Sequence, residues 1–171
     1  ARKRLWHLRA RRVVLATGAH ERPIVFGNND LPGIVLAGAA CTFANRYGVS
    51  LGRCGVAFVN NDAGFSAALE THVAARNLTH IVDVRGTPGA EQSRRATQAG
   101  IRLLSAHIVT HAEGRKRIRA VRLRSLTGDH AERIACDHLL VSGGLNPAVH
   151  LYSQAPGSLR YNESLACFVP D

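Results

Sequence analysis

The sequence lacks any closely spaced cysteines. Its four cysteines are widely separated along 171 residues, and none belongs to a C-x-x-C motif. Disulfide-rich scaffolds carry many cysteines, and redox motifs and zinc sites carry them at short spacing. We therefore predict that none of these sites is encoded and that the cysteines are reduced, buried thiols. They are Cys41, Cys54, Cys136 and Cys167.

The sequence also lacks a long hydrophobic run. Its longest apolar stretch covers residues 34–41, whereas a membrane-spanning helix needs about 20 apolar residues. The basic residues at 1–4 are followed by no apolar core of the kind that a signal peptide has. We therefore expect a cytoplasmic protein with no membrane partner. The 46% of hydrophobic residues predicts a globular chain, long enough for one well-packed domain.

Acidic residues are scarce. The sequence has 12 acidic and 22 basic residues, which gives a net charge of +10 and would suit an anionic partner. The arginines are scattered over expected hairpin ends and helix surfaces, not gathered in one stripe with interleaved aromatics. We therefore expect no nucleic-acid partner. If the chain is part of a larger protein, some of this charge would face acidic neighbouring subunits.

The stretch 55–84 organises the chain, and it lacks the glycines that such a stretch usually has. An apolar run at 55–59, a turn at 60–64, a helical pattern from Phe65 to Arg76-Asn77 and a second apolar run at 78–84 predict a β-α-β unit. We expect Asn77 to tolerate the left-handed conformation that ends the helix. The unit is typical of dinucleotide-binding folds, in which the first turn reads G-x-G-x-x-G. Here the glycine positions fall on Asn60, Asp62 and Phe65.

Two aspartates bear on whether a dinucleotide binds at this turn. Asp62 would face a pyrophosphate with like charge, which argues against one there. Asp83 stands at the end of the second strand, where an acidic residue would bind a ribose hydroxyl. The alternative is a strand-end aspartate that caps the turn at 86–89, and the missing glycines favour this alternative.

The remaining pattern completes a predicted fold. We expect a helix at 36–47 ended by Gly48, a helix at 90–99 and a parallel strand at 101–104. Antiparallel strands follow at 108–113, 118–126 and 131–136, and a last parallel strand at 138–142. This order describes an α/β chain, a three-layer domain of the FAD/NAD(P)-binding type with a parallel sheet and an antiparallel β-meander. Its expected core residues are Phe58, Val59, Leu69, Ile81, Val82, Leu103, Leu140 and Val141.

Several segments resemble one family. The expected buried strand at 13–16 and the turn Thr17-Gly18-Ala19 look like the strand and "ATG" turn that close the first nucleotide domain of two-dinucleotide-domain flavoprotein reductases. The motif "LATGAxERP" narrows this to the amine-oxidising branch. "NNDLPGIVLAGAACTFANRYGV" and "GVAFVNNDAGFSAAL" resemble the alpha subunit of heterotetrameric sarcosine oxidase, whose second nucleotide domain also has an Asn-Asp turn. The resemblance covers all 171 residues.

The resemblance implies oxidative demethylation of sarcosine to glycine with formation of hydrogen peroxide. It also implies NAD on the alpha subunit, FAD and FMN in the assembled complex, three further subunits as partners, a small amine substrate, and folate bound by a C-terminal domain that this sequence lacks. No residue here is a credible catalytic base or flavin attachment point, so we expect the chain alone to be inactive. The alternatives are a subunit of a related opine, proline or cyanide-synthase-type dehydrogenase, and a non-catalytic scaffold for subunit assembly.

The expected domains are the end of a first nucleotide domain with a connecting helix at 1–49, a degenerate second one at 50–147, and a return segment at 148–171. We predict that NAD contacts Thr17, Gly18, Ala19 and Arg22 and leaves the Asn60–Asp62 turn empty, because a glycine and an arginine suit a diphosphate.

No metal is expected. His107 and His111 are four residues apart, but they lie on an expected strand, where the metal-binding geometry of a helix does not arise. His20 and Glu21 are neighbours in an extended segment, where side chains point apart.

Overall fold

A computed structural model describes residues 3–171. The described residues divide into two compact units, one formed by 3–20 with 146–171 and the other by Glu21–Leu145. No helix of the described chain is long and apolar enough to cross a membrane.

The larger unit, Glu21–Leu145, is built on a parallel sheet with the strand order β2-β9-β3-β4-β5. The strands are β2 (Ile34–Leu36), β3 (Gly55–Val59), β4 (Leu78–Asp83), β5 (Arg102–Ser105) and β9 (His138–Ser142). Ala57 lies beside Ile81 on one side and Leu140 on the other, and Ile81 lies beside Leu103, as the apolar runs predict. Every residue of β3 and β9 is buried, which explains the apolar runs at Gly55–Val59 and at 139–141.

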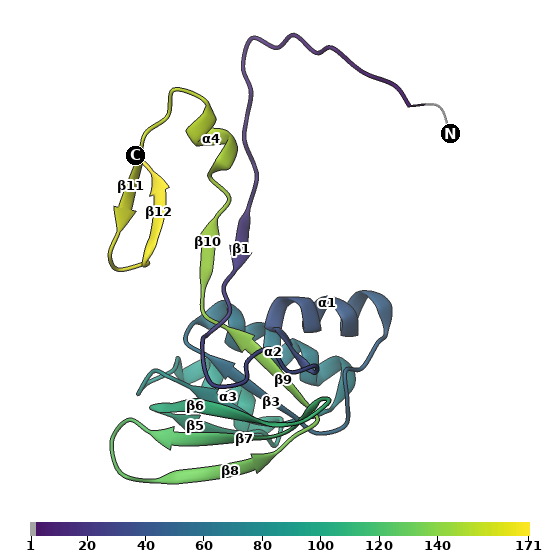
Figure 1. Ribbon diagram of the computed structural model, residues 1–171, viewed down its shortest axis with the longest axis vertical. Coiled ribbons are helices and arrows are strands. Elements are labelled where there is room, and N and C mark those ends of the chain that lie inside the picture. Colours follow the sequence, from purple (N-terminus) through teal and green to yellow (C-terminus); the bar gives the residue numbers. More distant parts are fainter. Residues whose placement is uncertain (1–2) are drawn as a thin grey trace. The chain divides into compact units, whose positions relative to one another are not determined.

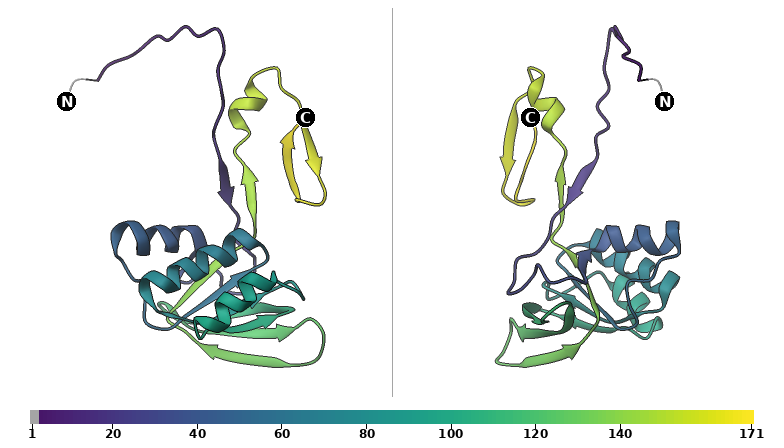
Figure 2. Two further views of the ribbon diagram at one scale, coloured as in Figure 1. Left: turned by 180° about the vertical axis from the view of Figure 1, so that it is seen from behind. Right: turned by 45° about the vertical axis from the view of Figure 1, so that its right-hand side comes forward.

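The two faces of this sheet are covered differently. Helices α1 (Ala37–Tyr47), α2 (Asp62–Ala75) and α3 (Ala90–Gln98) pack on one face, and the antiparallel strands β6 (His107–Gly114), β7 (Ile118–Ser125) and β8 (Ala131–Ala135) pack on the other (Figure 1; Figure 2). The described part of the unit therefore has the three layers expected from the sequence.

The side chains of β3 show how alternation fills both interfaces. Val56 and Phe58 face the meander and pack with Val121 and Leu123. Ala57 and Val59 face the helices. Burying a side chain such as Phe58, which is 1% exposed, stabilises the fold by about 1.5–3 kcal/mol. The predicted core is confirmed, with Leu103 partly buried at the edge of the helix-side cluster.

Helix ends follow the expected caps with one exception. Gly48 ends α1 in the left-handed conformation, with φ of 64°. At the end of α2, however, Arg76 and not Asn77 adopts the left-handed conformation, with φ of 47°. Asn77 is buried, and its side-chain amide donates hydrogen bonds to Ser50 Oγ and to the Gly52 carbonyl oxygen. The side-chain role of Asn77 leaves the left-handed position to its neighbour.

The smaller unit contains α4 (His150–Gln154) and an antiparallel hairpin of β11 (Leu159–Asn162) and β12 (Cys167–Pro170). Short strands β1 (Ala19–Glu21) and β10 (Leu145–Pro147) pair with each other. The predicted buried strand at 13–16 is wrong, because these residues form no strand and Val13 and Val14 are 76% and 89% exposed. No strand among the described residues pairs with them.

Residues 21–49 belong to the larger compact unit, although the sequence analysis assigned them to the end of a first domain. They contribute the edge strand β2 and the helix α1. The domain bounds 1–49, 50–147 and 148–171 remain a prediction for the whole protein. Of the cysteines, Cys136 and Cys167 are buried as expected, but Cys41 and Cys54 are only half-buried. All four are free thiols.

Candidate functional site

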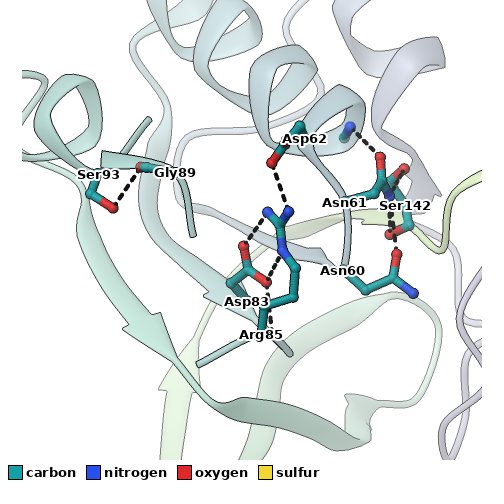
Figure 3. Close-up of polar contacts among 9 residues, drawn as sticks. Asn60, Asn61, Asp62, Asp83, Arg85, Gly89, Ser93 and Ser142 are labelled. Carbon is teal, nitrogen blue, oxygen red and sulfur yellow. Dashed lines mark hydrogen bonds and ion pairs between the residues drawn. The ribbon is translucent and has the colours of Figure 1, made fainter. Parts of the chain in front are cut away.

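The carboxyl ends of β3, β4 and β9 meet at one edge of the parallel sheet, where open α/β sheets bind ligands. Asn60 and Asn61 follow β3, Asp83 ends β4, and Ser142 ends β9 (Figure 3). We call this region the carboxyl edge. It is where a dinucleotide phosphate would lie against the start of α2.

Asn61 occupies the start of α2 with its own side chain. Its backbone is extended, and its Oδ1 accepts a hydrogen bond of 2.8 Å from Gly64 N. Its Nδ2 donates to the carbonyl oxygen and to Oγ of Ser142, each at 3.1 Å. Asn61 is therefore the N-cap of the helix and also ties it to β9.

The helix begins at Asp62, three residues earlier than Phe65, where the sequence pattern placed its first apolar contact. Gly64 then lies inside the first turn, and a Cβ at this position would be only 2.3 Å from Ser142 Cβ. Close packing of helix on strand is the role of the third glycine in the fingerprint. The structure thus corrects the alignment by one residue, so that Asn61, not Asp62, stands where the second glycine would be.

Asp83 and Arg85 form the most buried ion pair at this edge. Asp83 is fully buried, and its carboxylate accepts hydrogen bonds from Arg85 Nε at 3.0 Å and from Arg85 Nη2 at 2.8 Å. It also accepts the backbone N–H of Arg85 at 2.9 Å. These bonds raise the pKa of the Arg85 guanidinium above its usual value. Asp83 therefore caps the end of its strand, which is the alternative that the sequence analysis preferred. Its partner is Arg85, the residue directly before the 86–89 turn, and not a residue of the turn itself.

The remaining side of the Arg85 guanidinium faces α2. Arg85 Nη1 donates to Asp62 Oδ1 at 2.6 Å, so one guanidinium joins two carboxylates (Figure 3). The side chain of Asp62 is 64% exposed and that of Arg85 30%. The negative charge of Asp62, which the sequence analysis treated as uncompensated, is paired. We call Asp62, Asp83 and Arg85 the Arg85 cluster.

The sequence analysis did not identify Arg85 or Ser142 as members of this edge. The position of Arg85, two residues after the strand-end Asp83, was the available signal, because a buried carboxylate requires a nearby cation. The sequence contains no comparable signal for Ser142, because its contact with Asn61 joins residues 81 positions apart.

The residues predicted to contact NAD lie in two places. Thr17 Oγ1 donates to the Ala148 carbonyl oxygen at 2.7 Å, and the Gly18 carbonyl oxygen accepts from Ala148 N at 2.9 Å. Gly18 has φ of 69°, and apart from Gly18 and its two chain neighbours no described atom lies within 4 Å of the position that its Cβ would take. Ala19 begins β1 and is exposed. These three residues belong to the smaller unit.

Arg22 belongs to the larger unit. Its backbone N–H donates to the Gly144 carbonyl oxygen at 2.8 Å, and its carbonyl oxygen accepts from Gly143 N at 2.7 Å. A Cβ at Gly144 would be 2.7 Å from Arg22 Nη2, so the glycine leaves room for the guanidinium. The structure therefore gives Arg22 a defined backbone position next to Gly143-Gly144.

The histidines noted in the sequence have separate partners. His107 Nδ1 is 2.7 Å from the Ser105 carbonyl oxygen, and His111 Nε2 is 3.0 Å from Asn28 Nδ2. The His20 ring packs edge-on against His150, whereas the Glu21 carboxylate accepts the Gly38 N–H at the start of α1. Within residues 3–171, no three His, Cys, Asp or Glu side chains gather as a metal site would require.

Comparison with known proteins adds to this geometry. No protein-family model matches the sequence. The chain is 41% identical over its whole length to the sarcosine oxidase subunit alpha of Corynebacterium sp. (strain P-1), of which it covers 18%. It is 38% identical over 98% of its length to the same subunit of Rhizobium meliloti (strain 1021), of which it covers 16%. The resemblance to the sarcosine oxidase alpha subunit is confirmed.

The chain thus spans less than a fifth of the length of these sarcosine oxidase alpha subunits. Among solved structures, thioredoxin reductase from T. acidophilum matches with a TM-score of 0.68 at 14% identity, over 84% of this chain and 47% of the reductase. L-proline dehydrogenase from P. horikoshii matches with a TM-score of 0.59 at 24% identity, over 95% of this chain and 26% of the dehydrogenase. These likenesses confirm the predicted fold class.

Proposed function

We propose that this chain is part of an alpha subunit of the sarcosine oxidase type, which takes part in the oxidative demethylation of sarcosine to glycine with formation of hydrogen peroxide. The observation that supports the proposal is the 41% identity to a named alpha subunit along the whole chain. The chemistry belongs to the complete protein. The role that we propose for this chain within it is binding and assembly.

The experiment is a sarcosine-dependent peroxide assay. The full-length gene is expressed together with its neighbouring small genes, and hydrogen peroxide is followed with a peroxidase-coupled dye. We expect peroxide with sarcosine and little with proline or an opine. Turnover of proline with dye reduction and no peroxide from sarcosine would instead support the alternative, a related dehydrogenase subunit.

The cofactor expected on this chain is NAD, with FAD and FMN elsewhere in the assembled complex. The fold supports a nucleotide ligand, and the open backbone at Gly18 fits the close approach of a diphosphate or adenosine. We propose Thr17, Gly18, Ala19 and Arg22 as its contacts. The partners proposed are the other subunits, a small amine substrate, and folate bound outside this chain. The cytoplasmic location stays a prediction.

The proposed NAD contacts can be tested by measuring NAD released on denaturing the purified complex. Gly18→Val adds a branched side chain to a residue with positive φ and should lower NAD content severalfold. Gly86→Val is the matched control, because the position of the Gly86 Cβ is also open and its backbone is not left-handed. Full NAD content in the Gly18 variant would contradict the proposed contacts.

A second candidate function is a scaffold for subunit assembly. It is favoured by the carboxyl edge, where side chains of this chain satisfy one another without a ligand. Titration of NAD into the full-length protein separates the two candidates. Tight binding that the Gly18 variant loses supports the cofactor role, and no binding at all supports the scaffold.

A further inference from the structure

In the Arg85 cluster, different nitrogens of one guanidinium bind two different carboxylates. Nε and Nη2 bind the fully buried Asp83, which requires a cation because an unpaired buried carboxylate is very costly. This pair fixes Arg85 at the end of β4. The remaining nitrogen, Nη1, points toward the start of α2, where it donates a hydrogen bond of 2.6 Å to Asp62 Oδ1.

The start of α2 offers a second donor that an anion could use. In a β-α-β unit that binds a dinucleotide, backbone N–H groups in the first turn of the helix bind a phosphate. Here the Gly64 N–H is taken by Asn61 Oδ1 at 2.8 Å. Two donors at the carboxyl edge, Gly64 N–H and Arg85 Nη1, are thus bound by oxygens of the adjacent residues Asn61 and Asp62.

We propose that Asn61 and Asp62 act as a tethered substitute for a phosphate group and thereby close the carboxyl edge of this unit to nucleotides. Asn61 supplies a neutral oxygen to the helix, and Asp62 supplies the negative charge to Arg85. Because both belong to the chain, they bind intramolecularly, at an effective concentration of about millimolar or more. A free phosphate would have to displace them and then face the Asp62 charge. This inference goes beyond the proposed function, because it concerns an edge to which that proposal assigns no ligand.

The inference predicts that removing Asp62 creates a binding site. Asp62→Gly frees Arg85 Nη1 and removes the like charge, and the double variant Asn61→Gly, Asp62→Gly also frees the Gly64 N–H. The probe is inorganic pyrophosphate, titrated calorimetrically into the full-length protein at low salt. We expect the affinity to rise about tenfold or more in Asp62→Gly, since a charge-assisted hydrogen bond becomes available. It should rise further in the double variant and return to the wild-type value when Arg85→Gln is added.

Two controls keep the result specific. Asp129→Gly removes the same charge from an exposed turn and should leave pyrophosphate binding unchanged, which excludes an effect of net charge. Asp62→Asn keeps the side-chain length and should also gain affinity, so a glycine variant that fails to fold does not decide the matter. Circular dichroism melts verify that each variant is folded.

The inference is overturned if Asp62→Asn binds pyrophosphate no better than the wild type. It is also overturned if Arg85→Gln weakens pyrophosphate binding by the wild type, because the arginine would then already be open to anions. These outcomes do not depend on the sarcosine-dependent peroxide assay, so the inference and the proposed function can fail separately.

Discussion

Arg85 binds the buried carboxylate of Asp83 through two guanidinium nitrogens although only one residue separates them in the sequence. The strand-end aspartate and its counter-ion thus form one local motif. Because Asp83 is fully buried, loss of this arginine would leave its carboxylate without the cation that it contacts.

Replacement of Arg85 should destabilise the larger unit. Arg85→Ala leaves the Asp83 carboxylate buried without its cation, so we expect a loss of about 3–5 kcal/mol in the free energy of unfolding, measured by urea denaturation. Arg94→Ala is the matched control, because Arg94 pairs with Glu91 on the exposed surface of α3. That change should cost less than about 1 kcal/mol. Equal losses in the two variants would contradict the burial argument.

The contact between α2 and β9 can be tested by a pair of substitutions. Gly64→Ala places a Cβ within 2.3 Å of Ser142 Cβ, and such overpacking costs about 1–3 kcal/mol. Adding Ser142→Gly removes the opposing atoms and should restore part of the thermal stability. Gly86→Ala, at an open position, should have little effect. No recovery in the double variant would mean that Ser142 is not what Gly64 avoids.

The pH dependence of stability should depend on Glu113. Hydrogen bonds from Arg122 and Arg133 lower the pKa of Glu113 below its usual value of 4.5. The carboxylate therefore stabilises the fold above that value, and this contribution is lost as pH falls through the lowered pKa of the folded state. We expect Glu113→Gln to be less stable than the wild type near neutral pH and equally stable in acid, as measured by urea midpoints. Glu163→Gln, at an exposed turn, should be as stable as the wild type at both pH values.

The buried thiol of Cys136 should resist alkylation. Burial raises its pKa to about 12, so almost none of the reactive thiolate is present at about pH 8. Iodoacetamide should leave Cys136 unmodified in the native protein and modify it in denaturant, as peptide mass spectrometry can follow. Labelling of Cys136 at equal rates in both conditions would show that this side of the sheet is open.

The elements that the sequence predicts well are those that carry their own signals. The helix ended by Gly48 and the strand His138–Ser142 were both predicted, because a left-handed glycine and a continuous apolar run are local features. The edge strand Ile34–Leu36 was missed, because three residues show no periodicity and its partner β9 lies more than a hundred residues later. Residues 13–16 show the opposite error, a strand that was predicted and is not present. Their side chains are apolar, but a strand also needs a partner strand.

The candidate site was predictable only in outline. The sequence placed Asp83 at the end of its strand, but it put Asp62 in the turn, whereas Asp62 is the first residue of α2. The contacts of Arg85 with Asp62 and Asp83 were not foreseen, because the direction of a side chain at a turn cannot be derived from spacing. Thr17, Gly18, Ala19 and Arg22 remain a prediction as cofactor contacts.

The strand order of the parallel sheet constrains how a newly made chain can fold. β9, the last strand of the sheet to be synthesised, lies between β2 and β3, which are made first. Until Ser142 has left the ribosome, β2 and β3 therefore have no strand to join them, and their apolar edges stay open to other chains. The long separation of these pairings also slows folding. We therefore expect truncation before β9 to yield aggregated protein, whereas the meander β6-β7-β8, whose pairings are local, can form earlier.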